Sequence, residues 1–173
     1  MDLLATIGLE ETHTPLHIIL IRLIVAAGLG ALIGFERGAK SGVAGLRTHI
    51  LIALAAALFT VLTFEIYHSS LQYSPQGADP IRAVEAVTAG IAFLGAGAIF
   101  QQRGSVQGLT TGAGMWLAGA VGVSTALGYY VIALAAALLA IIVLAAMRRF
   151  SHQVVGKGKT RQGESPHSTT QQN

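Results

Sequence analysis

The chain contains no cysteine and few charged residues. The absence of cysteine excludes disulfide bonds and thiolate metal sites. Only 11% of the 173 residues are charged, whereas a soluble domain typically carries about 25%, and 53% are hydrophobic. The net charge of +3 does not indicate nucleic-acid binding, because the basic residues are spread between apolar segments rather than along one face. The composition therefore predicts a protein of the lipid bilayer.

Motifs of catalysis are also missing from the sequence. It has no His-Glu-x-x-His, no Gly-x-Ser-x-Gly and no close pair of carboxylates within an apolar segment. Only eight residues are acidic, and three of them precede the first apolar segment. We therefore expect no enzymatic activity.

Five apolar segments are present, each near the roughly 20 residues that cross a bilayer core. They cover residues 16–35, 47–66, 82–101, 108–125 and 127–147. The pattern predicts an all-α, polytopic membrane helix bundle of about five transmembrane helices. We divide the chain into an extracytoplasmic N-terminal segment (1–15), a transmembrane domain (16–150) and a disordered polar cytoplasmic tail (151–173).

The basic residues orient these segments. A count of five crossings places nine of them on one side: Arg37, Lys40, Arg47, Arg103, Arg148, Arg149, Lys157, Lys159 and Arg161. Lys and Arg accumulate in cytoplasmic loops. The sequence therefore predicts an N-terminus outside the cytoplasm and a cytoplasmic C-terminus.

Polar residues form two layers when the segments are aligned by depth. The expected inner layer, a functional polar cluster, comprises Glu36, Arg37, Arg47, Thr48, His49, Thr110 and Thr111. The outer charge layer comprises Arg22, Glu65, Asp79, Arg82 and Glu85. A charged side chain near the hydrocarbon core of a bilayer costs free energy, so we expect the residues of each layer to pair with one another or to serve a function.

Within the inner layer, the short loop between the first two segments should bring Glu36 between Arg37 and Arg47. His49 could ligate a metal, carry a proton or be held by a hydrogen bond. In the outer layer, an Arg22–Glu85 pair is the simplest neutralisation, and Arg82–Glu85 is the alternative on one helix face. Such pairs either fix helix register or bind an ion or substrate.

Glycines recur at helical spacing within the apolar segments. Those assigned to helix packing are Gly30, Gly34, Gly90, Gly95, Gly97, Gly108 and Gly112. Small residues four apart let two helices approach closely. The alternative for the 90–97 group is a discontinuous helix that exposes carbonyls to a cation.

Several of these motifs, taken in order, resemble the MgtC/SapB family. They are Arg22 with Gly34-Phe35-Glu36-Arg37, then Ala44-Gly45-Leu46-Arg47-Thr48-His49, Asp79-Pro80 with Arg82, Gly90-Ile91-Ala92-Phe93-Leu94-Gly95-Ala96-Gly97, and Gly108-Leu109-Thr110-Thr111 with Trp116. The resemblance covers residues 16 to about 147. Ala92 stands where the family usually has glycine, and Gly112 where it usually has alanine.

The resemblance implies a multi-pass protein of the bacterial inner membrane that is linked to magnesium homeostasis. It implies a modulator that contacts other membrane proteins, such as the proton-translocating ATP synthase, in adaptation to low magnesium. The alternative is a magnesium or other cation transporter with Glu36, Asp79 and Glu85 as ligands. No cofactor is expected apart from an interaction with Mg²⁺, and the small-residue faces are compatible with a homo-oligomer. Many family members continue into a cytoplasmic α/β regulatory domain, whereas this sequence ends in a polar tail.

Overall fold

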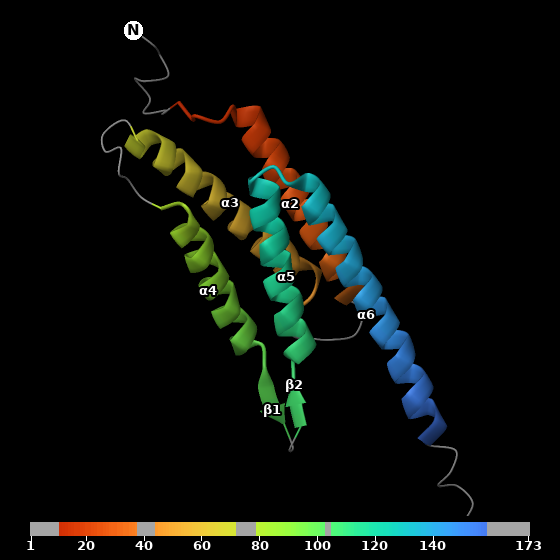
Figure 1. Ribbon diagram of the computed structural model, residues 1–173. Coiled ribbons are helices and arrows are strands. Elements are labelled where there is room, and N and C mark those ends of the chain that lie inside the picture. The colour runs from red at the N-terminus through yellow and green to blue at the C-terminus, as the bar shows by residue number, and fades with distance from the viewer. Residues whose placement is uncertain (1–10, 38–43, 72–78, 103–104, 159–173) are drawn as a thin grey trace, which may run out of the picture. The chain divides into compact units, whose positions relative to one another are not determined.

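The computed structural model describes residues 11–37, 44–71, 79–102 and 105–158 (Figure 1). Residues 1–10, Lys40, Arg103 and the tail beyond Gly158 lie outside this part. The expectations for the first ten residues and for the tail after 158 therefore stay predictions, whereas residues 151–158, predicted as part of a disordered tail, continue the last helix.

Five helices and one hairpin make up the described part of the chain. In order they are α2 (Leu16–Arg37), α3 (Leu46–Leu71), α4 (Ile81–Gly97), β1 (Phe100–Gln102), β2 (Ser105–Gln107), α5 (Leu109–Ala126) and α6 (Tyr130–Gly158). Each helix overlaps one of the five apolar segments of the sequence. The predominantly helical fold is therefore as the sequence predicts.

The hairpin between α4 and α5 is the feature that the hydropathy pattern did not predict. Helix α4 ends at Gly97, so the predicted third segment runs four residues past the helix. Strands β1 and β2 pair antiparallel, with Phe100 opposite Gln107. Glycines weaken the end of α4, and the glutamines that follow carry polar side chains that favour an exposed hairpin over a continued apolar helix.

The chain divides into two compact units, residues 1–141 and residues 142–173. Within the first unit, α2 packs on α3 and α5, and α3 packs on α5. Helix α4 packs chiefly on α5 and makes fewer contacts with α3 (Figure 1). Because α4 has fewer contacts with α3 than with α5, a groove remains between α3 and α4.

The core of this first unit is rich in alanine. Ala26, Ala53, Ala118, Ala133 and Ala137 are fully buried. Side chains of this size keep the helix axes close together, as is common in membrane helix bundles.

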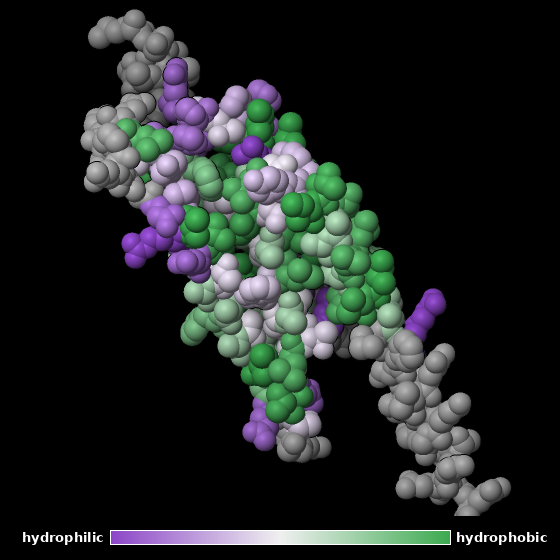
Figure 2. Space-filling model, viewed as in Figure 1, coloured by the Kyte–Doolittle hydropathy of each residue, from purple (hydrophilic) through white to green (hydrophobic). Residues whose placement is uncertain are grey.

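Large apolar side chains lie on the outside of the helices. Phe35, Phe93 and Val131 are 77%, 80% and 82% exposed. Figure 2 shows hydrophobic residues covering the start of α6, with hydrophilic ones gathered on the first turns of α4 and near the tip of the hairpin. Two described helices, α2 and α3, are long and apolar enough to cross a membrane. Together these features support a membrane protein.

Candidate functional site

The buried polar site of the bundle is centred on His49, in the first turn of α3. Its side chain is fully buried. The ring nitrogen Nδ1 lies 2.9 Å from the backbone oxygen of Gly45. A carbonyl oxygen can only accept, so Nδ1 carries a proton and donates it to this bond. The backbone just before α3 therefore fixes the orientation of the ring.

The other ring nitrogen of His49 faces α5 at Gly114. A Cβ atom placed on Gly114 would lie 3.1 Å from Nε2 of His49 and 3.6 Å from Nε of Arg37. Both side chains therefore reach the same small space, which exists because residue 114 has no side chain. Nε2 of His49 has no hydrogen-bond partner within the described residues.

Two glycines of α2 bring the start of α3 close enough to build this site. A Cβ on Gly30 would lie 2.7 Å from the backbone oxygen of His49. A Cβ on Gly34 would lie 2.8 Å from Cα of Leu46 and 3.0 Å from Cβ of His49. Most of these neighbouring atoms belong to the α3 backbone, and the contacts hold the end of α2, with Arg37, against the start of α3.

The remaining residues of the predicted inner layer occupy different environments. Glu36 is half-buried and attracts Arg37 electrostatically. Thr111 is buried on α5, whereas Arg47 and Thr110 are exposed. Thr48 faces a groove between α3 and α4. The structure thus brings Arg37 and His49 together, and contact between Glu36 and Arg47 stays a prediction.

The predicted outer layer is more dispersed. Glu85 and Arg82 are exposed on the first turns of α4. Arg22 is half-buried on α2, and its Nη2 atom lies 3.4 Å from the Cβ position of Gly128. The Nε atom of Arg22 is buried without a hydrogen bond in the described part of the chain. Arg22 therefore lies against the α5–α6 connection, and no ion pair with Glu85 is formed there.

Two outer carboxylates bind backbone N–H groups. Glu65 on α3 accepts hydrogen bonds from the N–H groups of His13 and Thr14, just before α2. Asp79 accepts a hydrogen bond of 2.9 Å from the N–H of Ile81, the first residue of α4. A carboxylate at this place satisfies an otherwise unpaired N–H group and favours the helix dipole. Both residues therefore have structural roles.

The remaining predicted packing glycines occupy three kinds of position. Gly95 and Gly112 face one another across the α4–α5 contact, with the Cβ position of Gly112 2.9 Å from the oxygen of Gly95. Gly108 has φ of +86°, a conformation that favours glycine, at the N-terminus of α5. Gly90 and Gly97 on α4 have nothing within 4 Å of their Cβ positions. These two positions face open space instead of another helix.

Sequence reasoning missed Gly114 and Gly122, whose Cβ positions approach His49 and Ala53 on α3. The Cβ position of Gly122 overlaps the backbone oxygen of Ala53 on α3. Their spacing was a usable signal, because Gly114, Ala118 and Gly122 follow one another every four residues and so share a helix face.

The described residues contain no group of three or more His, Asp or Glu side chains that could hold a metal ion. The buried site offers one imidazole nitrogen beside a guanidinium. That combination suits a hydrogen-bonding role better than the binding of a hard cation, which prefers several oxygen ligands.

A bundle of apolar helices joined by glycine contacts, with a buried histidine beside an arginine, supports the class of helical membrane proteins. Residues 23–153 match the MgtC family, and the chain belongs to that family. The sequence is 33% identical over 138 residues to "Putative magnesium transporter YhiD" of Escherichia coli strain K12, which covers 80% of this chain and 64% of that protein.

Two proteins named MgtC are also similar. Protein MgtC of Salmonella choleraesuis is 35% identical over 145 residues, covering 84% of this chain and 59% of the relative. Protein MgtC of Salmonella typhimurium strain LT2 is 40% identical over 120 residues, covering 69% and 48%. The chain thus spans between about half and two thirds of these relatives. No solved structure matches it.

Proposed function

We propose that this chain is a multi-pass protein of the bacterial inner membrane that acts in magnesium homeostasis by binding other membrane proteins through its helices. Membership of the MgtC family supports the link to magnesium, because relatives carry the names MgtC and "Putative magnesium transporter YhiD". Five crossings with a cytoplasmic C-terminus are part of this proposal, supported by the one-sided distribution of basic residues.

The kind of polar group inside the bundle favours a modulator over a transporter. His49 is fully buried, the half-buried Arg37 reaches the same space beside Gly114, and glycine contacts hold α2, α3 and α5 together around it. A guanidinium repels a divalent cation, and carboxylate oxygens would be needed to replace the water that Mg²⁺ gives up reluctantly. This arrangement supports a closed bundle that acts through its outer surface.

The alternative is a cation transporter, which the printed name of the Escherichia coli relative favours. Its candidate ligands are Glu36, Asp79 and Glu85. Asp79 just precedes α4 and Glu85 lies in its first turns, which face the C-terminal half of α3. Glu36 lies in the last turn of α2, beside the start of α3. The three carboxylates therefore lie toward opposite ends of α3, and a transporter would need further groups between them.

A paired measurement distinguishes the two functions. The full chain is reconstituted into liposomes that enclose a magnesium-sensitive dye, and it is also expressed in a bacterial strain that lacks its own MgtC-type protein and grows poorly in low magnesium. We expect restored growth with no dye response above that of protein-free liposomes. A dye response that Glu85→Gln or Glu36→Gln abolishes would establish transport and overturn the modulator.

Direct contact with a partner can be tested by photo-cross-linking in cells. A photoreactive residue at Phe93, which is 80% exposed on α4, should capture an integral membrane protein. The ATP synthase is the partner that the family resemblance suggests. The matched control places the photoreactive residue at Ile33, which is fully buried, and should capture only this chain. Equal capture at both positions would contradict binding through the helix surface.

A further inference from the structure

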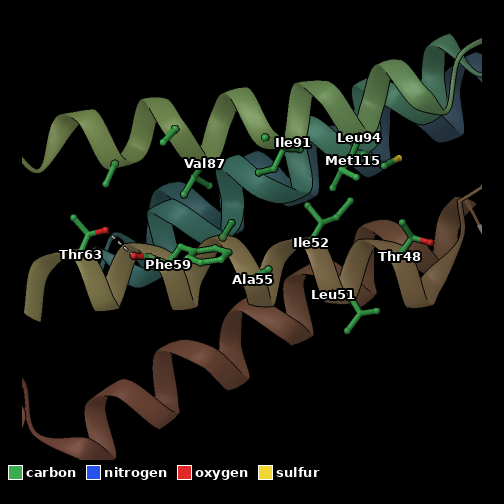
Figure 3. A pocket seen from close by; sticks show the side chains of 14 residues that line it. Thr48, Leu51, Ile52, Ala55, Phe59, Thr63, Val87, Ile91, Leu94 and Met115 are labelled. Atoms are coloured by element: carbon green, nitrogen blue, oxygen red, sulfur yellow. Dashed lines mark hydrogen bonds between the residues drawn. The ribbon is translucent and has the colours of Figure 1, made fainter. Parts of the chain in front are cut away.

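A groove lies between α3 and α4, and it follows α3 from Thr48 to Thr63. Its volume is about 710 Å³. Figure 3 shows side chains of α3, among them Ile52 and Phe59, and side chains of α4, among them Val87 and Ile91, facing each other across it. The groove exists because α4 packs chiefly on α5 and leans away from α3.

The lining of the groove is almost wholly apolar. Its described hydroxyl groups are those of Thr48 and Thr63, at its two ends. Thr63 donates its hydroxyl hydrogen to the backbone oxygen of Phe59 on its own helix, at 2.8 Å. A polar ligand would find almost no partners along this groove, so its occupant must itself be apolar along most of its length.

The dimensions of the groove fit a hydrocarbon chain better than a helix. From Thr48 to Thr63 the groove follows α3 for about 22 Å at the helical rise per residue. A volume of 710 Å³ over that length gives a mean cross-section of about 32 Å². A helix about 10 to 12 Å across needs roughly 80 to 110 Å². A hydrocarbon chain about 4 to 5 Å wide needs roughly 13 to 20 Å².

The two ends of the groove differ in charge. At the Thr48 end, the exposed Arg47 lies in the first turn of α3, beside the last turn of α2 with Glu36 and Arg37. At the opposite end, Arg82 has the exposed carboxylates of Asp79 and Glu85 three residues before and after it. An anionic group is therefore favoured at the Arg47 end and disfavoured at the Arg82 end.

We propose that the groove holds an acyl chain of an anionic phospholipid whose phosphate lies at Arg47. The acyl chain fills the space that α3 and α4 leave open, and the guanidinium of Arg47 binds the phosphate. Because α4 has few direct contacts with α3, the bound lipid also fixes the distance between these helices.

The proposal is tested with the full-length chain reconstituted in vesicles of equal parts phosphatidylglycerol and phosphatidylcholine. The protein is extracted in mild detergent, and the bound lipid is measured by native mass spectrometry. We expect one retained phospholipid per chain, with phosphatidylglycerol at least fivefold over phosphatidylcholine. No retained lipid, or equal retention of both, would refute the proposal.

Groove-filling variants locate the bound lipid. Gly90 lines the groove on α4, and a Cβ atom there meets nothing within 4 Å, so Gly90→Leu should fill the groove and reduce retained lipid at least fivefold. Ala55→Leu fills it from α3 and should act in the same way, so the result does not depend on the folding of one variant. Ala92→Leu on the exposed surface of α4 is the control and should retain lipid normally.

Charge variants identify the end that holds the phosphate. Arg47→Gln should reduce the preference for phosphatidylglycerol to about one, whereas Arg82→Gln should leave it unchanged. Equal lipid retention by Gly90→Leu and Ala92→Leu would refute the groove as the site. A complex of two chains that Gly90→Leu dissociates would show that a second copy of the protein is the occupant and would also refute the proposal.

Discussion

Substitution of Gly122 by alanine probes the closest approach of a helix glycine to the backbone of another helix. The added Cβ atom would overlap the backbone oxygen of Ala53 and lie 3.0 Å from its carbonyl carbon. Both atoms belong to the α3 backbone, so no side chain can rotate away to make room. The contact is relieved only if α5 and α3 move apart.

The size of the effect follows from two opposing terms. Overpacking a tight contact costs about 1 to 3 kcal/mol, and the upper value applies here because the obstructing atoms are backbone. Replacing glycine by alanine within a helix recovers about 1 kcal/mol. The net destabilisation of Gly122→Ala is therefore about 2 kcal/mol, and the melting temperature should fall by roughly 4 to 8 °C.

Gly28→Ala provides the matched control on α2. Nothing lies within 4 Å of the Cβ position of Gly28. Only the helix-propensity gain of about 1 kcal/mol remains, so its melting temperature should rise by roughly 2 to 4 °C. Both variants are measured in detergent by circular dichroism and by the fluorescence of Trp116. If Gly122→Ala melts at or above Gly28→Ala, the α3–α5 contact is not as close as described.

Four further outcomes are expected. Glu65→Ala removes the acceptor of two backbone N–H groups and should speed hydrogen exchange just before α2, with Thr63→Ala as control. Glu36→Gln should abolish growth rescue in low magnesium, whereas Lys40→Gln should not; rescue by both would refute the inner cluster. A reporter fused after Phe150 should be active only as a cytoplasmic reporter, and a periplasmic signal would reverse the orientation. Deletion of the residues after Val155 should leave membrane insertion intact, and loss of insertion would contradict a disordered tail.

The sequence alone determined the helical class, the family and the positions of the helices. Long apolar runs can satisfy their backbone groups in lipid only as helices, so hydropathy locates α2 to α6 without knowledge of their packing. The sequence determined the helix ends less well. The end of α4 at Gly97 depends on the backbone hydrogen bonds of Ala98 and on the hairpin that follows.

Only the tertiary structure decided which polar residues meet. Hydropathy gives depth but not rotation about a helix axis, so Arg47, Thr48 and His49 were one group in the sequence although only His49 is buried. Rotation is set by the glycine contacts of α2 and α5, which direct His49 toward Gly114 and Arg37. The same contacts leave Gly90 facing open space, because α4 follows α5 instead of α3. Sequence spacing shows which residues share a helix face, but the partner of that face is chosen by the packing of the other helices.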